Sequence, residues 1–146
     1  MEFVTIQGVQ LTPITRILNE KGDILHGIKS SEDSFNGFGE AYFSHILYKD
    51  IKGWKKHEKM ILNLLVPCGK IKFVLYDDRV NSKTFNQFNE FLLSVENYQR
   101  LTVSPGIWMA FQGMSVEKNL LLNIANIEHD TKEAIACDIN EINYKW

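Results

Sequence analysis

Several features that mark other classes of protein are scarce or absent in this sequence. Its 146 residues contain only two cysteines, too few for a disulfide framework, so we expect reduced thiols and a cytoplasmic protein. The formal net charge of -2 supplies no basic field for nucleic acid. No apolar run approaches the length of a membrane span, and the first ten residues lack the pattern of a signal peptide. We therefore expect neither a nucleic-acid partner nor a membrane.

What the sequence does contain is typical of a globular protein. Apolar residues make up 45% of the chain and aromatic residues 12%, which is enough to build a substantial core. No low-complexity linker divides the chain. The sequence therefore predicts one folded domain over residues 1–146.

The most informative stretch runs from residue 52 to residue 79. Two apolar runs, 61–66 and 71–76, flank the segment Pro67-Cys68-Gly69. Proline removes a backbone donor and glycine permits a positive φ, so this pattern predicts two strands joined by a tight turn. The polar segment at 55–59 leads into the first strand, which is the usual position of a pocket rim.

The same outline recurs later in the chain. A short strand is expected at 101–103, a turn at Ser104-Pro105-Gly106, and further strands at 107–111 and 120–127. A strand, a Pro-Gly turn and a strand, appearing twice, is typical of a cupin. The predicted fold class is therefore all-β, a double-stranded β-helix of the jelly-roll type, with few or no helices.

Other elements complete this expectation. Weak alternation predicts an edge strand at 2–7, and a period of two predicts a strand at 40–47. Residues 85–94 fit either a helix or a bulged strand, because the apolar residues recur at helical spacing while the topology expects a strand. The last residues, 139–146, are expected to form an extended tail.

Four segments carry a resemblance to a known family. They are KGWKKH at 52–57, GKIKFVLYDDR at 69–79, NYQRLTVSPGIWMAFQG at 97–113, and the final Trp146. In these segments the chain resembles the dTDP-4-dehydrorhamnose 3,5-epimerases and their sugar ketoisomerase and lipopolysaccharide-biosynthesis relatives. The resemblance implies a cupin barrel and a homodimer that exchanges N-terminal strands. It also implies a nucleotide-linked 4-keto sugar as ligand and a place in surface-polysaccharide biosynthesis.

The proton-transfer residues of that family are altered here. Such an epimerase needs a base, a group that stabilises the enolate oxygen, and an acid on the other face of the sugar. The resemblance places Lys55 at the position of the base histidine and His57 at that of a glutamine. It places Lys52 at a phosphate-binding arginine, Leu122 at the acid tyrosine, and the aspartate that orients the base near Asp138.

Two residues are nevertheless the predicted catalytic candidates, His57 and Lys55. His57 can act as a hydrogen-bond donor in the pocket or as a weak base. Lys55 could be a base if burial or the neighbouring Lys56 and Lys59 lowered its pKa. It could equally be a solvated charge at the rim or a ligand of phosphate or carboxylate, and either Lys52 or Lys55 could pair with a diphosphate.

The predicted ligand-binding residues are Lys52, Glu40, Tyr42, Asn63, Trp108 and Asn123. Asn63 and Asn123 interrupt apolar strands, so each needs a hydrogen-bond partner if it faces the barrel interior. A ligand hydroxyl is one candidate for that partner. Trp108 belongs either to the core or to a surface that stacks on a sugar or base. Glu40 and Tyr42 share a strand face and could point into one cavity.

A metal centre is not expected. A metal-binding cupin uses two histidines in a His-x-His pair, a glutamate and a final histidine. Lys55, His57, Ile61 or Leu62, and Met109 hold these positions, so one ligand of four remains. We predict no metal and no cofactor.

Two functions remain open at this point. The first is an enzyme that acts on a nucleotide-activated deoxysugar, as an epimerase or a ketoisomerase. The second is a non-catalytic cupin that binds such a sugar and regulates the same pathway. The altered base and acid favour the second, whereas the polar pocket residues and the whole-chain match favour the first.

Overall fold

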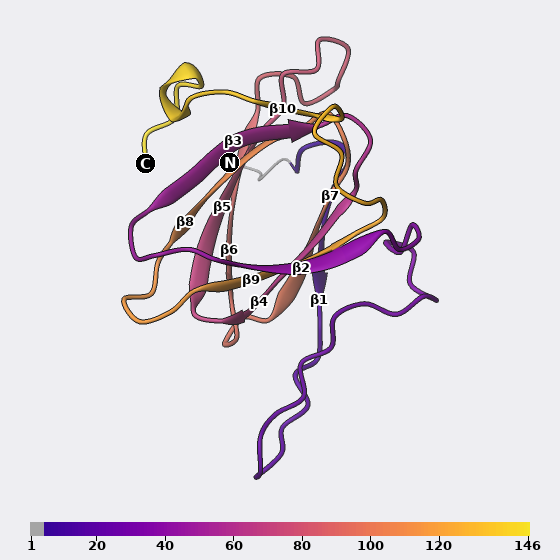
Figure 1. Cartoon of the computed structure of the whole chain (residues 1–146), viewed down its shortest axis with the longest axis vertical. Coiled ribbons are helices and arrows are strands. Elements are labelled where there is room, and N and C mark those ends of the chain that lie inside the picture. Colours follow the sequence, from indigo (N-terminus) through magenta and orange to yellow (C-terminus); the bar gives the residue numbers. More distant parts are fainter. Residues whose placement is uncertain (1–4) are drawn as a thin grey trace.

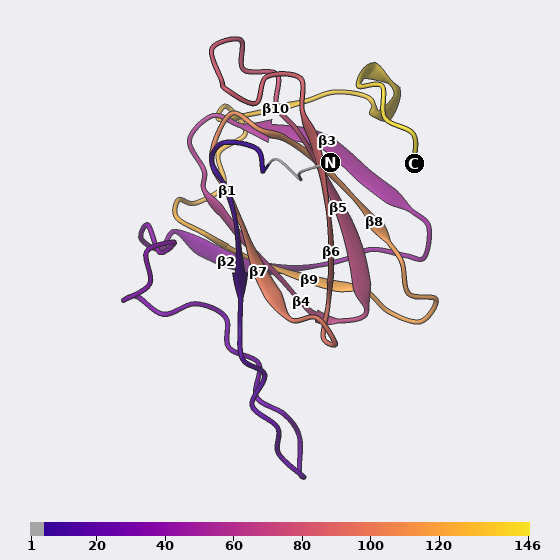
Figure 2. The same ribbon diagram turned by 180° about the vertical axis from the view of Figure 1, so that it is seen from behind.

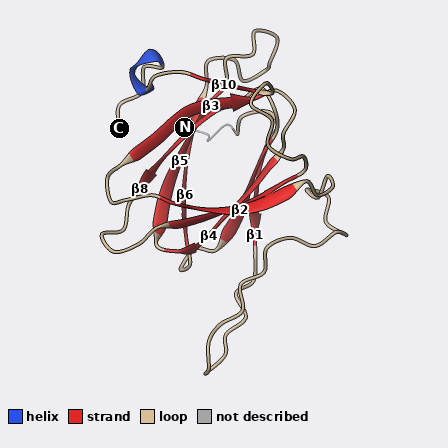
Figure 3. Cartoon of the chain, viewed as in Figure 1, coloured by secondary structure: helices blue, strands red, loops and turns tan. Residues whose placement is uncertain are grey.

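The computed structural model describes residues 5–146 and shows two five-stranded sheets packed face to face (Figures 1 and 2). One sheet has the strand order β1-β7-β4-β9-β2 and the other has the order β10-β3-β8-β5-β6. Strands and loops account for almost the whole described chain, and the helix in Figure 3 is one short 3-10 turn near the C-terminus. The all-β jelly-roll barrel predicted from the sequence is confirmed.

The elements have the following bounds. The strands are β1 (Val9–Pro13), β2 (Glu40–His45), β3 (Ile51–His57), β4 (Leu62–Cys68), β5 (Lys70–Tyr76), β6 (Phe88–Ser94), β7 (Gln99–Val103), β8 (Trp108–Gly113), β9 (Leu120–Ala125) and β10 (Ala134–Ala136). The 3-10 turn, η1, is Ile139–Glu141. The predicted edge strand at 2–7 falls partly on residues 1–4, which lie outside the described part, and the edge strand that is seen begins at Val9.

The strands on either side of each Pro-Gly turn do not pair with each other. β4 lies in one sheet and the following β5 in the other, and β7 and β8 are divided in the same way. The prediction of a tight hairpin between the first two strands was therefore wrong in its pairing. Gly69 adopts a φ of 81° at the first crossing, where a Cβ would lie 2.0 Å from the carbonyl oxygen of Lys118. Each turn therefore carries the chain from one sheet to the other, and these crossings close the barrel.

The segment that fitted either a helix or a strand is the strand β6. It pairs with β5 along its whole length, from Lys70 opposite Ser94 to Tyr76 opposite Phe88. Phe91 is buried and Leu92 is exposed, as the period of two requires of a sheet with one covered face. The helical spacing of its phenylalanines is therefore outweighed by pairing with β5.

The core fills the space between the sheets. Its fully buried side chains include Leu64, Phe73, Leu75 and Leu101. A second cluster lies outside the barrel, where Trp54 and Trp108 belong to a group of buried residues against which Tyr144 and Trp146 of the C-terminal segment pack. Among the described residues, no helix is long and apolar enough to cross a membrane.

Candidate functional site

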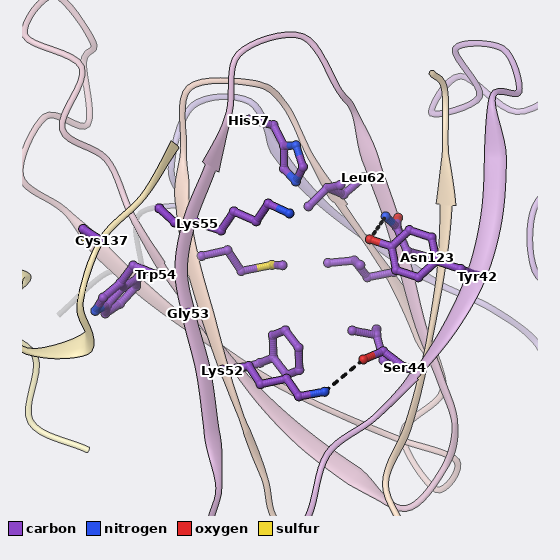
Figure 4. A pocket seen from close by; sticks show the side chains of 15 residues that line it. Tyr42, Ser44, Lys52, Gly53, Trp54, Lys55, His57, Leu62, Asn123 and Cys137 are labelled. Atoms are coloured by element: carbon purple, nitrogen blue, oxygen red, sulfur yellow. Dashed lines mark hydrogen bonds between the residues drawn. The ribbon is translucent and has the colours of Figure 1, made fainter. Parts of the chain in front are cut away.

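A cavity of about 350 Å³ lies between the sheets where β2 and β3 face each other (Figure 4). This volume is within the range of small-molecule sites. Its apolar wall includes Leu62, Leu64, Met109, Phe111 and Leu121. Its polar groups include Tyr42, Ser44, Lys52, Lys55, His57 and Asn123. The combination suits a ligand that is part apolar and part polar.

Strand β3 carries most of the charged groups of this cavity. The sequence predicted a polar lead-in at 55–59, but residues 55–57 are the end of β3, which pairs with β8 and β10. Lys55 and His57 share a face because they are two residues apart. Lys52 would face the opposite way, but the register shifts between Lys52 and Lys55, as at a bulge. All three side chains therefore point into the cavity (Figure 4).

His57 forms a buried pair with Glu133. The Nδ1 of His57 donates a hydrogen bond to a carboxylate oxygen of Glu133, and the backbone N–H groups of Lys59 and Met60 donate to the other oxygen. Burial raises the pKa of Glu133, but the hydrogen bonds from His57 and Lys59 outweigh it and hold that pKa below its ordinary value. The carboxylate fixes the proton on Nδ1, so Nε2 is the basic nitrogen available to the cavity.

Two lysines bring positive charge to the same space. The Nζ of Lys52 donates to the carbonyl oxygen of His45 at 2.6 Å and to the hydroxyl of Ser44 at 3.3 Å. In the described part of the chain, no ion pair neutralises Lys52 or Lys55. A cavity with unpaired cations attracts an anionic ligand or stabilises an oxygen that becomes negative during a reaction.

Tyr42 and Asn123 form the polar part of the opposite wall. They lie directly across from each other on the paired strands β2 and β9. The Nδ2 of Asn123 donates to the phenol oxygen of Tyr42 at 3.1 Å. The Oδ1 of Asn123 is buried and has no donor among residues 5–146. The sequence predicted that an asparagine facing the barrel interior needs a hydrogen-bond partner, which a ligand could supply. At Asn123 the atom concerned is Oδ1.

Three of the predicted ligand-binding residues lie elsewhere. Asn63 is buried on the other face of its strand, where it donates to the Ser34 carbonyl and accepts from the Thr102 hydroxyl. Trp108 belongs to the cluster outside the barrel and donates to Asp78 at 2.8 Å. The expectation that Asn63 faces the cavity was wrong, and Trp108 takes the core position rather than the sugar-stacking one, because the neighbouring residues on each strand line the cavity instead. Glu40 shares a strand face with Tyr42 but is not part of the cavity lining.

The carboxylate partner of His57 could not be read from the sequence. The resemblance placed an orienting aspartate near Asp138, but that side chain caps η1 by accepting from the N–H of Asn140. The carboxylate that His57 contacts is instead Glu133, a residue that belongs to no motif in the sequence. The position of the missing acid, Leu122, is likewise not in the cavity lining, although its neighbours Leu121 and Asn123 are.

The metal-binding geometry of other cupins has no counterpart here. Among the described residues, no three side chains of His, Cys, Asp or Glu gather closely enough to hold an ion. Cys68 and Cys137 are both free thiols. The groups that are present, a histidine–carboxylate pair beside two cations, can support proton transfer.

The chain is similar to known proteins over almost its whole length, although no family model matches it. The crystal structure of a dTDP sugar isomerase from Desulfovibrio desulfuricans G20 is 33% identical, with a TM-score of 0.92, and the match covers 97% of this chain and 92% of that one. The "Probable low-salt glycan biosynthesis epimerase Agl13" of Haloferax volcanii is 25% identical over 147 residues, 97% of this chain and 94% of that protein. A dTDP-4-dehydrorhamnose 3,5-epimerase from Sulfolobus tokodaii shares the fold, at 20% identity and a TM-score of 0.82, over 94% of this chain and 81% of that one. The chain therefore belongs to the family of dTDP-sugar isomerases and dTDP-4-dehydrorhamnose 3,5-epimerases.

Proposed function

We propose that this protein is an epimerase or isomerase of a nucleotide-linked 4-keto sugar in the biosynthesis of a surface glycan. The observation that carries this proposal is the His57–Glu133 pair, which presents a basic imidazole nitrogen to a cavity that also holds two lysines with no ion-pair partner among residues 5–146. The names of the relatives support the same class, since they include a dTDP sugar isomerase and a glycan biosynthesis epimerase.

His57 is the proposed general base. A proton on the carbon beside a ketone becomes acidic when a base removes it and a cation stabilises the enolate oxygen. Nε2 of His57 supplies the base, and the ammonium of Lys55, two residues earlier on the same strand face, supplies the cation. Lys52, at the other end of the cavity, is the proposed partner of the diphosphate.

The alternative of a non-catalytic sugar-binding cupin is less well supported. A binding module needs cations and apolar surface, but it has no use for a buried carboxylate that orients an imidazole toward the ligand. Two of the relatives are also named as an isomerase and an epimerase.

Solvent exchange provides the test. The protein would be incubated in deuterated water with dTDP-, GDP- and CDP-linked 4-keto sugars, and deuterium next to the ketone would be followed by NMR. We expect exchange with one of these nucleotides, and its loss in His57→Asn. Glu58→Gln, which removes an exposed carboxylate beside the histidine, should exchange normally. No exchange with any of the three nucleotides would refute the proposal.

A homodimer built by exchange of N-terminal strands is also proposed. The supporting feature is that β1 is the edge strand of its sheet and pairs only with β7 among the described strands, so a second chain could supply the same ladder. Sedimentation at micromolar concentration should give a dimer, and a monomer would contradict this. A cytoplasmic location, supported by the two free thiols, remains part of the proposal.

A further inference from the structure

The proton donor for the second half of an epimerisation is missing from its expected place. The resemblance assigned it to the position of Leu122, whose side chain has no proton to give and does not line the cavity. An enzyme that inverts a carbon must deliver a proton to the face opposite the one from which the base removed it. The donor should therefore stand on the wall opposite His57.

Tyr42 meets that requirement. Figure 4 shows its phenol group projecting into the cavity from β2, while His57 projects into it from β3. These strands belong to different sheets, so a sugar ring between them has the imidazole on one side and the phenol on the other. Ser44 is the other hydroxyl on this wall, where it accepts from Lys52, but an alkyl hydroxyl releases its proton far less readily than a phenol.

The hydrogen bonding of Tyr42 leaves its proton free. Asn123 donates its Nδ2–H to the phenol oxygen, so the phenol acts as an acceptor in this pair and can donate its own O–H to a ligand. When the proton leaves, the same N–H stabilises the negative charge on the phenol oxygen. Asn123 is 1% exposed, and its strand holds it directly opposite Tyr42.

The geometry points to Tyr42 as the general acid of an epimerisation, with Asn123 as its positioning residue. This assignment rests on the proposed function and narrows it from an isomerase or epimerase to an epimerase. His57 removes the proton from the carbon beside the ketone, and the electron pair moves onto the ketone oxygen as an enolate. Tyr42 then protonates the same carbon on its other face, and the ketone reforms. Solvent returns a proton to Tyr42 and takes one from His57.

The unpaired oxygen of Asn123 adds a contact to the substrate. A buried acceptor without a donor is rare, and a hydroxyl of the bound sugar can satisfy it. The amide would then hold the phenol with its nitrogen and the sugar with its oxygen. This fixes the position of the Tyr42 phenol relative to one hydroxyl of the substrate.

The experiment separates proton removal from proton delivery. The wild type and Tyr42→Phe would be incubated in deuterated water with the nucleotide-linked 4-keto sugar that the wild type accepts. Exchange and inversion at the carbon would be measured by NMR. The matched control is Tyr48→Phe, since Tyr48 is 44% exposed against 43% for Tyr42 and lies outside the cavity. Equal melting temperatures would establish that the variants are folded.

We expect Tyr42→Phe to keep exchange without inversion, because His57 can return a deuteron to the face it attacked, while epimer formation falls at least about 10²-fold. Asn123→Leu should show the same pattern, which a merely structural defect would not produce, and Tyr48→Phe should match the wild type. Inversion at the wild-type rate in Tyr42→Phe would overturn this assignment alone, as would loss of exchange in that folded variant. A wild type that moves the ketone without inverting the carbon would also overturn it, and a wild type without exchange would overturn the proposed function itself.

Discussion

Replacing Glu133 with glutamine tests the histidine–carboxylate pair directly. In the wild type, the two carboxylate oxygens accept hydrogen bonds from His57 and from the backbone N–H groups of Lys59 and Met60. Glutamine keeps the volume and one acceptor oxygen, but it places an NH₂ group where the second oxygen stood. That group cannot accept from Nδ1, so His57 would take the tautomer that carries its proton on Nε2 and would lose its basic nitrogen in the cavity.

The expected magnitudes follow from these contacts. The loss of a hydrogen bond to a buried charge costs about 1.5–3 kcal/mol. With a urea dependence of about 1–3 kcal/mol per molar, the unfolding midpoint should fall by roughly 1 M. Exchange and epimer formation should fall by about 10²–10⁴, the usual contribution of a general base. The glutamine variant should therefore lose much more activity than stability.

The pH dependence of the free energy of unfolding provides a second, independent test of the His57–Glu133 pair. Burial raises the pKa of Glu133, but the hydrogen bonds from His57 and Lys59 hold it below its ordinary value of 4.5. A lowered pKa in the folded state stabilises the fold above the unfolded value, and this contribution is lost as the pH falls through the folded value. The stability difference between wild type and Glu133→Gln should thus be full at pH 7 and shrink once the pH falls below 4.5.

Urea unfolding from pH 7 to pH 3, followed by intrinsic fluorescence, would measure this difference. Glu58→Gln is the matched control, because Glu58 is an exposed carboxylate next to His57 and should leave both the midpoint and the acid dependence unchanged. A wild-type midpoint at pH 7 in Glu133→Gln, or wild-type exchange in that variant, would refute the proposed role of the pair.

Three further predictions concern other parts of the molecule. Gly69→Ala should lower stability by more than about 2 kcal/mol, because the left-handed backbone costs about 1–2 kcal/mol and the Cβ would also meet the Lys118 oxygen at 2.0 Å; calorimetry against Gly37→Ala, which has a positive φ but open space, isolates the clash. Asp77→Asn should cost about 3 kcal/mol in urea unfolding, because buried Asp77 accepts from Arg79, Ser82 and Thr84, and an unchanged midpoint would contradict this. Lys55→Ala should lower the rate of deuterium exchange about 10²- to 10³-fold by NMR, without lowering the melting temperature, because it removes the cation beside the enolate oxygen; the wild-type exchange rate in this variant would remove Lys55 from the site.

The parts of the fold that were predicted correctly have strong local signals. The apolar run at 71–76 ends at turn residues, and it is β5 (Lys70–Tyr76). The pairing of the strands could not be predicted in this way, because it depends on residues far apart in the sequence. β4 looks like the partner of β5 in sequence, but it pairs with β7 and β9 instead. The crossing between sheets follows from closing a barrel, which a local pattern does not encode.

The site was predicted in part, and the errors have a common cause. Tyr42, Lys52, Lys55, His57 and Asn123 all line the cavity as expected. Alternation along a strand shows which residues share a face, but not which of the two faces meets the cavity. Asn63 lies on the face of β4 away from the cavity, and its neighbours Leu62 and Leu64 line it instead.

Glu133 could not be predicted as the partner of His57 for a different reason. It lies 76 residues from His57 along the chain, in a segment whose composition indicates only a loop. A carboxylate contact across that separation is decided by how β10 docks on β3, and β10 is three residues long. Short edge strands of this kind have almost no periodicity to detect. A single sequence therefore supplies the histidine but not its partner.

His57 and Glu133 both stand away from the positions that the family resemblance gives to the base and its carboxylate. The register of β10 against β3 explains the direction of the two shifts. The two strands are antiparallel, with Ala136 opposite Lys55 and Ala134 opposite His57. A base two residues further along β3, about 7 Å away, therefore requires a carboxylate earlier on the facing segment. Glu133 is earlier than Asp138, and the antiparallel geometry makes that the correct direction. Under the proposed function, His57 and Glu133 therefore act as the base and its carboxylate, and Lys55 stands at the position that the resemblance gives to the base.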